Sequence, residues 1–229
     1  MPEATVNGLR LHFASEGSGD AFLFIPGLGT ELSAYRRLLR RLGQSYRVIA
    51  LQARDASRRG ASDPPLSIEA MADDASGLLD VLGARPAHVL GVSLGGRVAL
   101  ALALRHPGQV KSLILASTAP RPAPSGRRVA FLLRISGILK RRSPARERTV
   151  AAHYAAAHSF DVTGRLTEIA VPTLILHGLS DRISPYAMAE EMHRAIACSR
   201  LVPLPGGHLT LFTHMDAFLR GVLSFLGDS

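Results

Sequence analysis

The sequence has very little cysteine and no long apolar run. Cys198 is the only cysteine among 229 residues, which excludes an internal disulfide framework and a cysteine-based zinc cluster. The longest clean apolar stretch, Val98–Leu104, lies between Arg97 and Arg105. It is far shorter than the ~20 residues that a helix needs to cross a bilayer, so we expect no transmembrane segment. Residues 1–19 lack a charged start followed by an apolar run, so we expect a cytoplasmic protein without a secretory signal.

Acidic residues are scarce in one part of the chain. The formal net charge is +9, from 27 lysines and arginines against 18 acidic residues. Between Arg121 and Arg148 stand nine basic residues and one acid, Glu147, so this segment alone carries +8 of that charge. The rest of the protein is nearly neutral, and we therefore expect no nucleic-acid binding by its body.

Apolar residues make up 47% of the sequence and charged residues 20%. This composition supports a sizeable core and excludes a disordered chain. The length fits a single α/β domain over residues 1–229.

Short apolar runs alternate with helical patterns along the chain. The Asn7-Gly8 pair predicts an N-terminal hairpin over residues 5–13, because both turn residues must take positive φ. In the helix predicted at 68–82 we expect Asp73, Asp74 and Asp80 to face solvent. The other strands are predicted at 21–26, 46–51, 87–92, 112–117, 173–177 and, more weakly, 201–203; the other helices at 33–42, 94–105, 185–196 and 216–226. The alternation indicates a mostly parallel central sheet with an antiparallel N-terminal hairpin and helices on both faces.

One insert interrupts this alternation, and we predict that residues 119–170 form a short helical lid. Prolines frame its basic part. Residues 129–139 place apolar side chains on one helical face, and Arg127, Arg134 and Arg141 recur at seven-residue spacing on the other. Three interpretations stay open: a lid helix with its charges in solvent, a gate that concentrates anionic substrates, and contact with an anionic membrane surface.

The sequence Gly91-Val92-Ser93-Leu94-Gly95 matches the G-x-S-x-G pattern of a nucleophilic serine. A predicted strand runs directly into it and a helix rich in small residues leaves it, which is the context that the pattern requires. The flanking positions need small residues because the turn strains the backbone at the serine.

A serine hydroxyl needs a base, and the base needs an orienting carboxylate. Asp181 stands four residues after the strand at 173–177, and His208 lies on a glycine-rich turn before the last helix. We predict that Ser93, Asp181 and His208 are the catalytic residues, because all three follow predicted strands in the chain order Ser…Asp…His.

These features resemble the α/β-hydrolase fold superfamily, in particular enol-lactonase, haloperoxidase-like and esterase members. The match covers about residues 5–118 and 161–226. The resemblance implies that the backbone N–H groups of Leu28 and Leu94 bind the oxyanion. Two features depart from the family pattern: Pro26 stands where histidine is frequent, and residues 52–62 replace a more compact motif.

Several site residues also have plain structural interpretations. Ser93 could be a turn residue, Asp181 a helix cap and His208 a hydrogen-bonded loop histidine. We interpret His177 as structural because it ends an apolar strand and the base role is already filled. Asp161 is the alternative candidate for the orienting carboxylate. The other histidines have no ligand spacing, so no metal site is expected. They are His12, His88, His106, His153, His158, His193 and His214.

The sequence thus predicts a serine hydrolase that cleaves a small carboxylic ester or lactone without cofactor or metal. The alternatives are carbon–carbon bond cleavage or perhydrolysis on the same triad, and a ligand-binding or receptor-like module with little turnover. Epoxide hydrolases and dehalogenases are disfavoured because they carry aspartate where Ser93 stands. The expected partner is a small molecule, with the protein a monomer or homodimer, and the short lid argues against long lipid chains.

Overall fold

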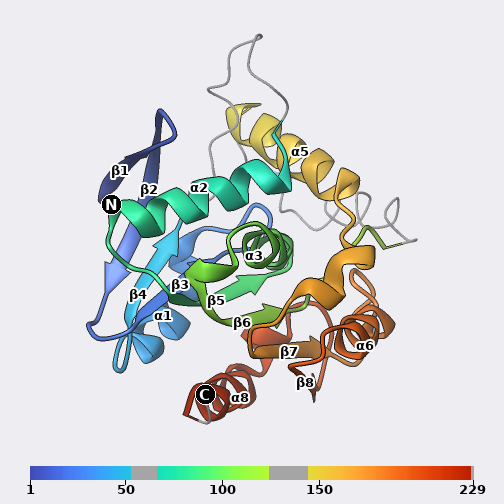
Figure 1. The fold of residues 1–229 in the computed structure, drawn as a ribbon. Helices are drawn as coiled ribbons and strands as arrows, with labels where there is room; N and C mark the ends of the chain where they lie inside the picture. Colours follow the sequence, from blue (N-terminus) through green and yellow to red (C-terminus); the bar gives the residue numbers. More distant parts are fainter. Residues whose placement is uncertain (53–65, 124–143, 228–229) are drawn as a thin grey trace.

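A computed structural model of the protein describes residues 1–52, 66–123 and 144–227. Its centre is an eight-stranded sheet in the order β1-β2-β4-β3-β5-β6-β7-β8 (Figure 1). The strands are β1 (Glu3–Val6), β2 (Leu9–Glu16), β3 (Ala21–Ile25), β4 (Arg47–Leu51), β5 (Ala87–Val92), β6 (Val110–Ala116), β7 (Thr173–Gly178) and β8 (Ser199–Leu204). The α-helices are α1 (Arg36–Leu42), α2 (Ile68–Val81), α3 (Leu94–Arg105), α5 (Pro144–Ser159), α6 (Tyr186–Ala195), α7 (Thr210–Thr213) and α8 (Met215–Gly227).

The N-terminal hairpin is formed as the sequence predicts. Val6 pairs with Leu9 in antiparallel register, and the two residues between them, Asn7 and Gly8, take φ values of 49° and 75°. Positive φ at both central residues gives a turn whose twist matches that of the strands. β2 is also antiparallel to β4, whereas every later pairing, from β3 with β4 to β7 with β8, is parallel. The predicted mostly parallel sheet is confirmed.

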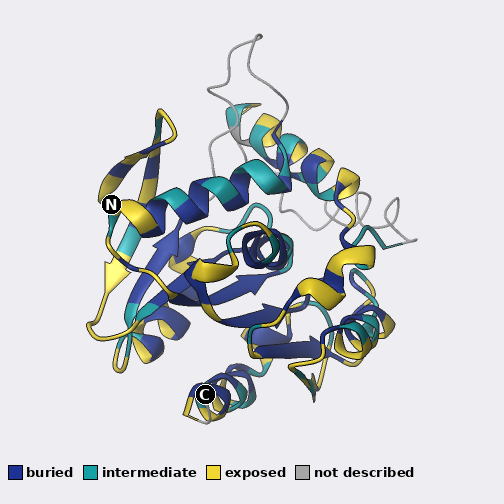
Figure 2. Cartoon of the chain, viewed as in Figure 1, coloured by how far each residue is buried: buried dark blue, intermediate teal, exposed yellow. Residues whose placement is uncertain are grey.

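Helices cover both faces of the sheet because its strands alternate between two hydrophobic clusters. On β3, Phe22 and Phe24 join the cluster that contains α1 and α8, whereas Leu23 and Ile25 join the one that contains α2, α3 and α6. The central strands are buried on both sides, which Figure 2 shows as a continuous dark layer. This two-sided burial explains why these strands read in the sequence as unbroken apolar runs.

Three local predictions need correction. The helix expected at 33–42 begins as a 3₁₀ turn over Leu32–Tyr35 and becomes α-helical only at Arg36. The last strand is longer than the run 201–203, because β8 covers Ser199–Leu204. Asp74 was expected in solvent but is buried, since α2 packs against β1 on that side and the amide of Asn7 lies 3.5 Å from the Asp74 carboxylate.

The insert at 119–170 is described in part. Its described residues contain α5 and a 3₁₀ helix over Thr163–Glu168. The amphipathic pattern at 129–139 and the divergent residues 53–62 lie outside the described residues, so the lid stays a prediction. Within the described ranges, the helices are too short or too polar to span a membrane.

Candidate active site

Ser93 occupies a strained turn between β5 and α3. Its backbone has φ 54° and ψ −112°, a conformation that non-glycine residues rarely adopt and that costs of order 1–3 kcal/mol. Two hydrogen bonds hold the turn in place: the Ser93 N–H donates to the Ala116 carbonyl at 2.9 Å, and the Thr118 hydroxyl donates to the Ser93 carbonyl at 2.7 Å. The strain presents the Ser93 hydroxyl at the carboxyl edge of the sheet.

The glycines around Ser93 are required by close packing. A Cβ on Gly95 would collide with the backbone carbonyl of Ile25 at the end of β3, and one on Gly91 would collide with the backbone of Gly95. Only residues without a side chain let β5, α3 and the neighbouring strand approach this closely. The small residues of the G-x-S-x-G pattern therefore serve the packing of this turn.

Asp181 and His208 come from the loops after β7 and β8, which are neighbouring strands at one side of the sheet. The Ser180 N–H donates to the Gly206 carbonyl at 2.9 Å and so ties the two loops together. The Thr210 hydroxyl donates to the Pro205 carbonyl at 2.7 Å, which braces the turn that carries His208. Parallel strands end at the same edge, so these loops meet the Ser93 turn there.

The structure brings all three side chains into hydrogen-bond contact. His208 Nε2 lies 2.9 Å from Ser93 Oγ, and His208 Nδ1 lies 2.8 Å from Asp181 Oδ2. Because a carboxylate only accepts hydrogen bonds, Nδ1 carries the ring proton in this arrangement. The unprotonated Nε2 then faces the Ser93 hydroxyl, the geometry that a general base requires.

Asp181 is held by donors on both oxygens. Oδ1 accepts the N–H groups of Ile183 and Ser184 at 2.8 and 2.9 Å. Oδ2 accepts His208 and lies 3.2 Å from Nε2 of His177. Burial acts to raise the pKa of Asp181, but the hydrogen bonds from His177, His208 and the Ser184 backbone outweigh it and hold the pKa well below its ordinary value. The carboxylate therefore stays ionised beside His208 at neutral pH.

His177 makes a contact that the sequence did not reveal. Its side chain is fully buried and its Nε2 lies 2.7 Å from the Ser184 carbonyl oxygen as well as 3.2 Å from Asp181 Oδ2. Both neighbours are acceptors, so Nε2 carries a proton, and within the described residues the other ring nitrogen, Nδ1, is buried without a hydrogen-bond partner. The expectation that His177 is structural agrees with this placement, but the residue it supports is Asp181.

One cavity contains Ser93 together with both residues expected to form the oxyanion hole. Leu28, from the turn after β3, and Leu94, the first residue of α3, line it beside Ser93. The first N–H groups of a helix have no acceptor within the helix, so the Leu94 N–H points out of the helix end. Arg97, one helical turn after Ser93, and Tyr154 of α5 line the same cavity.

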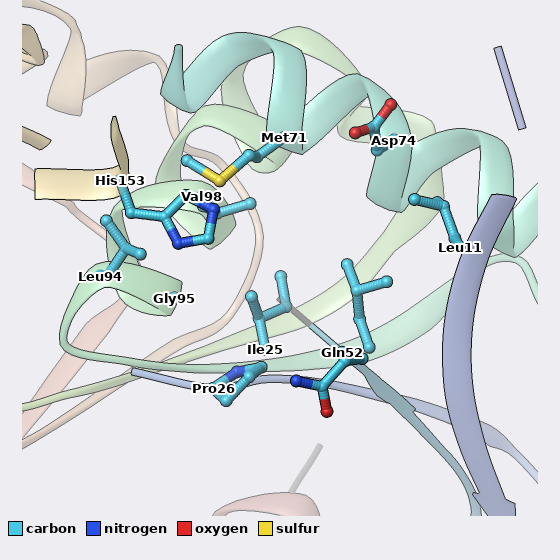
Figure 3. A pocket seen from close by; sticks show the side chains of 11 residues that line it. Leu11, Ile25, Pro26, Gln52, Met71, Asp74, Leu94, Gly95, Val98 and His153 are labelled. Atoms are coloured by element: carbon cyan, nitrogen blue, oxygen red, sulfur yellow. The ribbon is translucent and has the colours of Figure 1, made fainter. Parts of the chain in front are cut away.

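A second pocket shares Leu94 with the first cavity and is drawn in Figure 3. It is mainly apolar and is lined by Met71 of α2, Val98 of α3 and His153 of α5, among others. Ser93, Asp181 and His208 do not line it. Of these three residues, Ser93 lines the first cavity.

Asp161, the alternative candidate for the orienting carboxylate, is not part of this arrangement. Asp161 accepts the N–H of Thr163, the first residue of the following 3₁₀ helix, at 2.9 Å. In the described parts of the chain, no three histidine, cysteine or acidic side chains gather in a way that could hold a metal ion.

The sequence model of the family described as alpha/beta hydrolase fold matches residues 20–132. The chain is also 32% identical to a pimeloyl-[acyl-carrier protein] methyl ester esterase of Neisseria meningitidis, over 85% of this chain and 88% of that protein. The chain belongs to the α/β-hydrolase family. Its fold agrees: the enol-lactonase of Burkholderia xenovorans superposes with a TM-score of 0.84 at 27% identity, over 99% of this chain and 100% of that one.

Two further relatives differ in size. RutD of Variovorax paradoxus, a proposed carbamate hydrolase, is 29% identical over 95% of this α/β-hydrolase chain and 96% of its own length. Polyketide synthase ThaQ of Burkholderia thailandensis is 30% identical over 97% of this chain, which spans only 12% of that much longer protein. Three of these relatives are thus named as a methyl ester esterase, an enol-lactonase and a proposed carbamate hydrolase.

Proposed function

We propose that this protein is a serine hydrolase that cleaves a small carboxylic ester or lactone through an acyl-enzyme, with Ser93, His208 and Asp181 as its catalytic triad. The observation that carries the proposal is the 2.9 Å contact between Ser93 Oγ and His208 Nε2. The esterase and enol-lactonase named above support the substrate class.

The first half of the reaction forms the acyl-enzyme. His208 Nε2 takes the hydroxyl proton as Ser93 Oγ bonds to the carbonyl carbon of the ester. The carbonyl oxygen becomes an oxyanion that accepts the N–H groups of Leu28 and Leu94, each of which stabilises the transition state by ~3–4 kcal/mol. The bond to the leaving oxygen then breaks as the His208 imidazolium returns the proton to it. Asp181 stabilises that imidazolium and keeps the ring oriented.

The second half releases the acid. A water molecule attacks the acyl carbon, and His208 Nε2 accepts its proton. Collapse of the second oxyanion breaks the bond to Ser93 Oγ, which regains the proton from His208. The products are a carboxylic acid and the free enzyme.

The proposal is tested by labelling and by substitution. A fluorophosphonate should react with Ser93, and mass spectrometry of the tryptic peptide identifies the labelled residue. Ser93→Ala should lose the label and on the order of 10⁶ in kcat on 4-nitrophenyl esters. The matched control is Ser112→Ala, because Ser112 is also buried but lies near the amino end of β6, hydrogen-bonded to His88.

Two outcomes would contradict the proposal. Ser93→Ala could keep most of the esterase activity, or the wild-type protein could fail to react with fluorophosphonate and hydrolyse no ester. The second outcome favours a ligand-binding module with a misaligned triad. A panel of methyl esters, lactones and carbamates ranks the substrate classes, with carbamates included because of the likeness to RutD.

A further inference from the structure

Arg97 places a positive charge in the cavity that contains Ser93. It lies four residues after Ser93, at the start of α3. Arg97 is the fourth residue of α3, about one helical turn from the helix start beside Ser93, and both residues line this cavity. A short group attached to Ser93 therefore comes within reach of Arg97 by lying along α3.

The guanidinium of Arg97 has hydrogen-bond partners but no counter-ion among the described residues. It donates to the backbone carbonyl of Ala157 and, at 3.0 Å, to that of Arg121. Some other arginines in the described ranges pair with carboxylates, among them Arg37 with Asp216, Arg105 with Asp73, Arg121 with Glu191 and Arg165 with Glu168. Arg97 forms no such pair among the described residues, although it is less exposed than three of those four arginines.

Burial lowers the pKa of Arg97 to about 10, with Tyr154 acting in the opposite direction. The side chain thus keeps its charge at neutral pH, in surroundings where an uncompensated charge is costly. A guanidinium has five N–H donors, and the two carbonyls occupy two of them. The remaining donors match the two oxygens of a carboxylate.

We propose that Arg97 binds a carboxylate at the far end of the substrate's acyl part, so that the enzyme prefers half-esters of short dicarboxylic acids. This inference rests on the proposed function, because it takes Ser93 as the point where the acyl group is attached. The leaving alcohol must lie near His208, which protonates it, whereas the acyl chain is free to lie along α3 toward Arg97. The carboxylate then supplies the counter-ion that Arg97 lacks among the described residues.

The test compares two esters with the same leaving group. One is the mono-4-nitrophenyl ester of glutaric acid, which carries a carboxylate, and the other is 4-nitrophenyl pentanoate, which has the same chain length and no charge. The wild-type kcat/KM should be about 10- to 100-fold higher for the charged ester, as expected for hydrogen bonds to a charged group. This preference should weaken as ionic strength rises.

Arg97→Gln should abolish the preference mainly by raising KM for the charged ester, and Arg97→Lys should restore part of it because it keeps the charge. The matched control is Arg165→Gln, which removes one positive charge at an exposed site paired with Glu168 and should keep the wild-type ratio. If Arg97→Gln does not fold, the wild-type ratio and its salt dependence still decide the question.

Two results would overturn the inference. The wild-type enzyme could hydrolyse the uncharged ester as well as the charged one, or Arg97→Gln could lower kcat/KM equally for both, as a purely structural link from α3 to Ala157 and Arg121 would. In both cases fluorophosphonate labelling of Ser93 and turnover of the uncharged ester leave the proposed function standing. Absence of both labelling and turnover would overturn the two proposals together.

Discussion

Two histidines approach the same oxygen of Asp181: Nε2 of His177 lies 3.2 Å from Oδ2, and Nδ1 of His208 lies 2.8 Å from it. The His177 and Asp181 side chains are completely buried. Such a carboxylate has little freedom to rotate, because its other oxygen is held by two backbone N–H groups. The orientation of His208 therefore depends on a residue that does not itself touch the Ser93 hydroxyl.

The first prediction concerns His177. His177→Phe removes the N–H that faces Oδ2, and the resulting misplacement of Asp181 and His208 should lower kcat about 10-fold, since small errors in catalytic geometry are costly. Asp181→Asn should cost more, roughly 10⁴-fold in kcat, because it favours the wrong His208 tautomer. The measurement is kcat on an uncharged 4-nitrophenyl ester.

The control for His177 is His12→Phe, which alters an exposed histidine that pairs with Glu3 on the N-terminal hairpin. It should leave kcat at the wild-type value. A kcat for His177→Phe within twofold of wild type would mean that this hydrogen bond does not orient the site.

The second prediction concerns acid stability. The folded-state pKa of Asp181 is lowered, so its ionised form stabilises the fold fully above the unfolded pKa of about 3.9, and this contribution is lost as pH falls toward the folded value. The free energy of unfolding of the wild type minus that of Asp181→Asn should be constant above about pH 5 and should shrink below about pH 4. Urea unfolding from pH 3 to pH 7 measures this difference.

Subtracting the free energy of unfolding of Asp181→Asn from that of the wild type cancels the contributions of the other acidic residues. Asp20, Asp73, Asp161 and Glu168 also have lowered pKa values, but they are present in both proteins. A difference that does not change over this pH range would contradict the assigned pKa direction of Asp181.

The third prediction concerns the oxyanion. Leu28→Pro removes the backbone N–H that we assign to the oxyanion hole and should lower kcat by about 10²- to 10³-fold. Leu28→Ala keeps the N–H and removes only the apolar side chain, so its loss should be much smaller. Equal losses in the two variants would show that the Leu28 side chain, and not its N–H, matters for the reaction.

The fourth prediction concerns the packing of the turn that carries Ser93. Gly95→Ala introduces a Cβ that collides with the Ile25 carbonyl and should lower the free energy of unfolding by about 1–3 kcal/mol. Gly108→Ala is the control, because a Cβ there meets no atom within 4 Å. Chemical denaturation of both variants gives the comparison, and equal stability would disprove the steric requirement at Gly95.

Local sequence was sufficient to predict those structural features that depend on residues close together in the chain. Asn7-Gly8 predicted its hairpin, the apolar runs predicted the buried strands, and the glycines around Ser93 predicted a tight strand-to-helix turn. These features depend on backbone conformation and on burial of short segments, both of which leave a direct pattern in the residues themselves. Ser93, Asp181 and His208 could be identified in the same way, because each of them follows a predicted strand in the sequence.

The contacts between distant segments needed the tertiary structure. Asp74 looked solvent-facing in its helix, yet it is buried because β1 packs against that face of α2. His208 meets Ser93 across 115 residues, and Arg97 meets carbonyls 24 and 60 residues away. Sequence spacing carries no information on such distances, because the order of strands in the sheet determines which loops meet. The residue types were thus readable from the sequence, whereas their convergence at one edge of the sheet was decided by the sheet topology and helix packing.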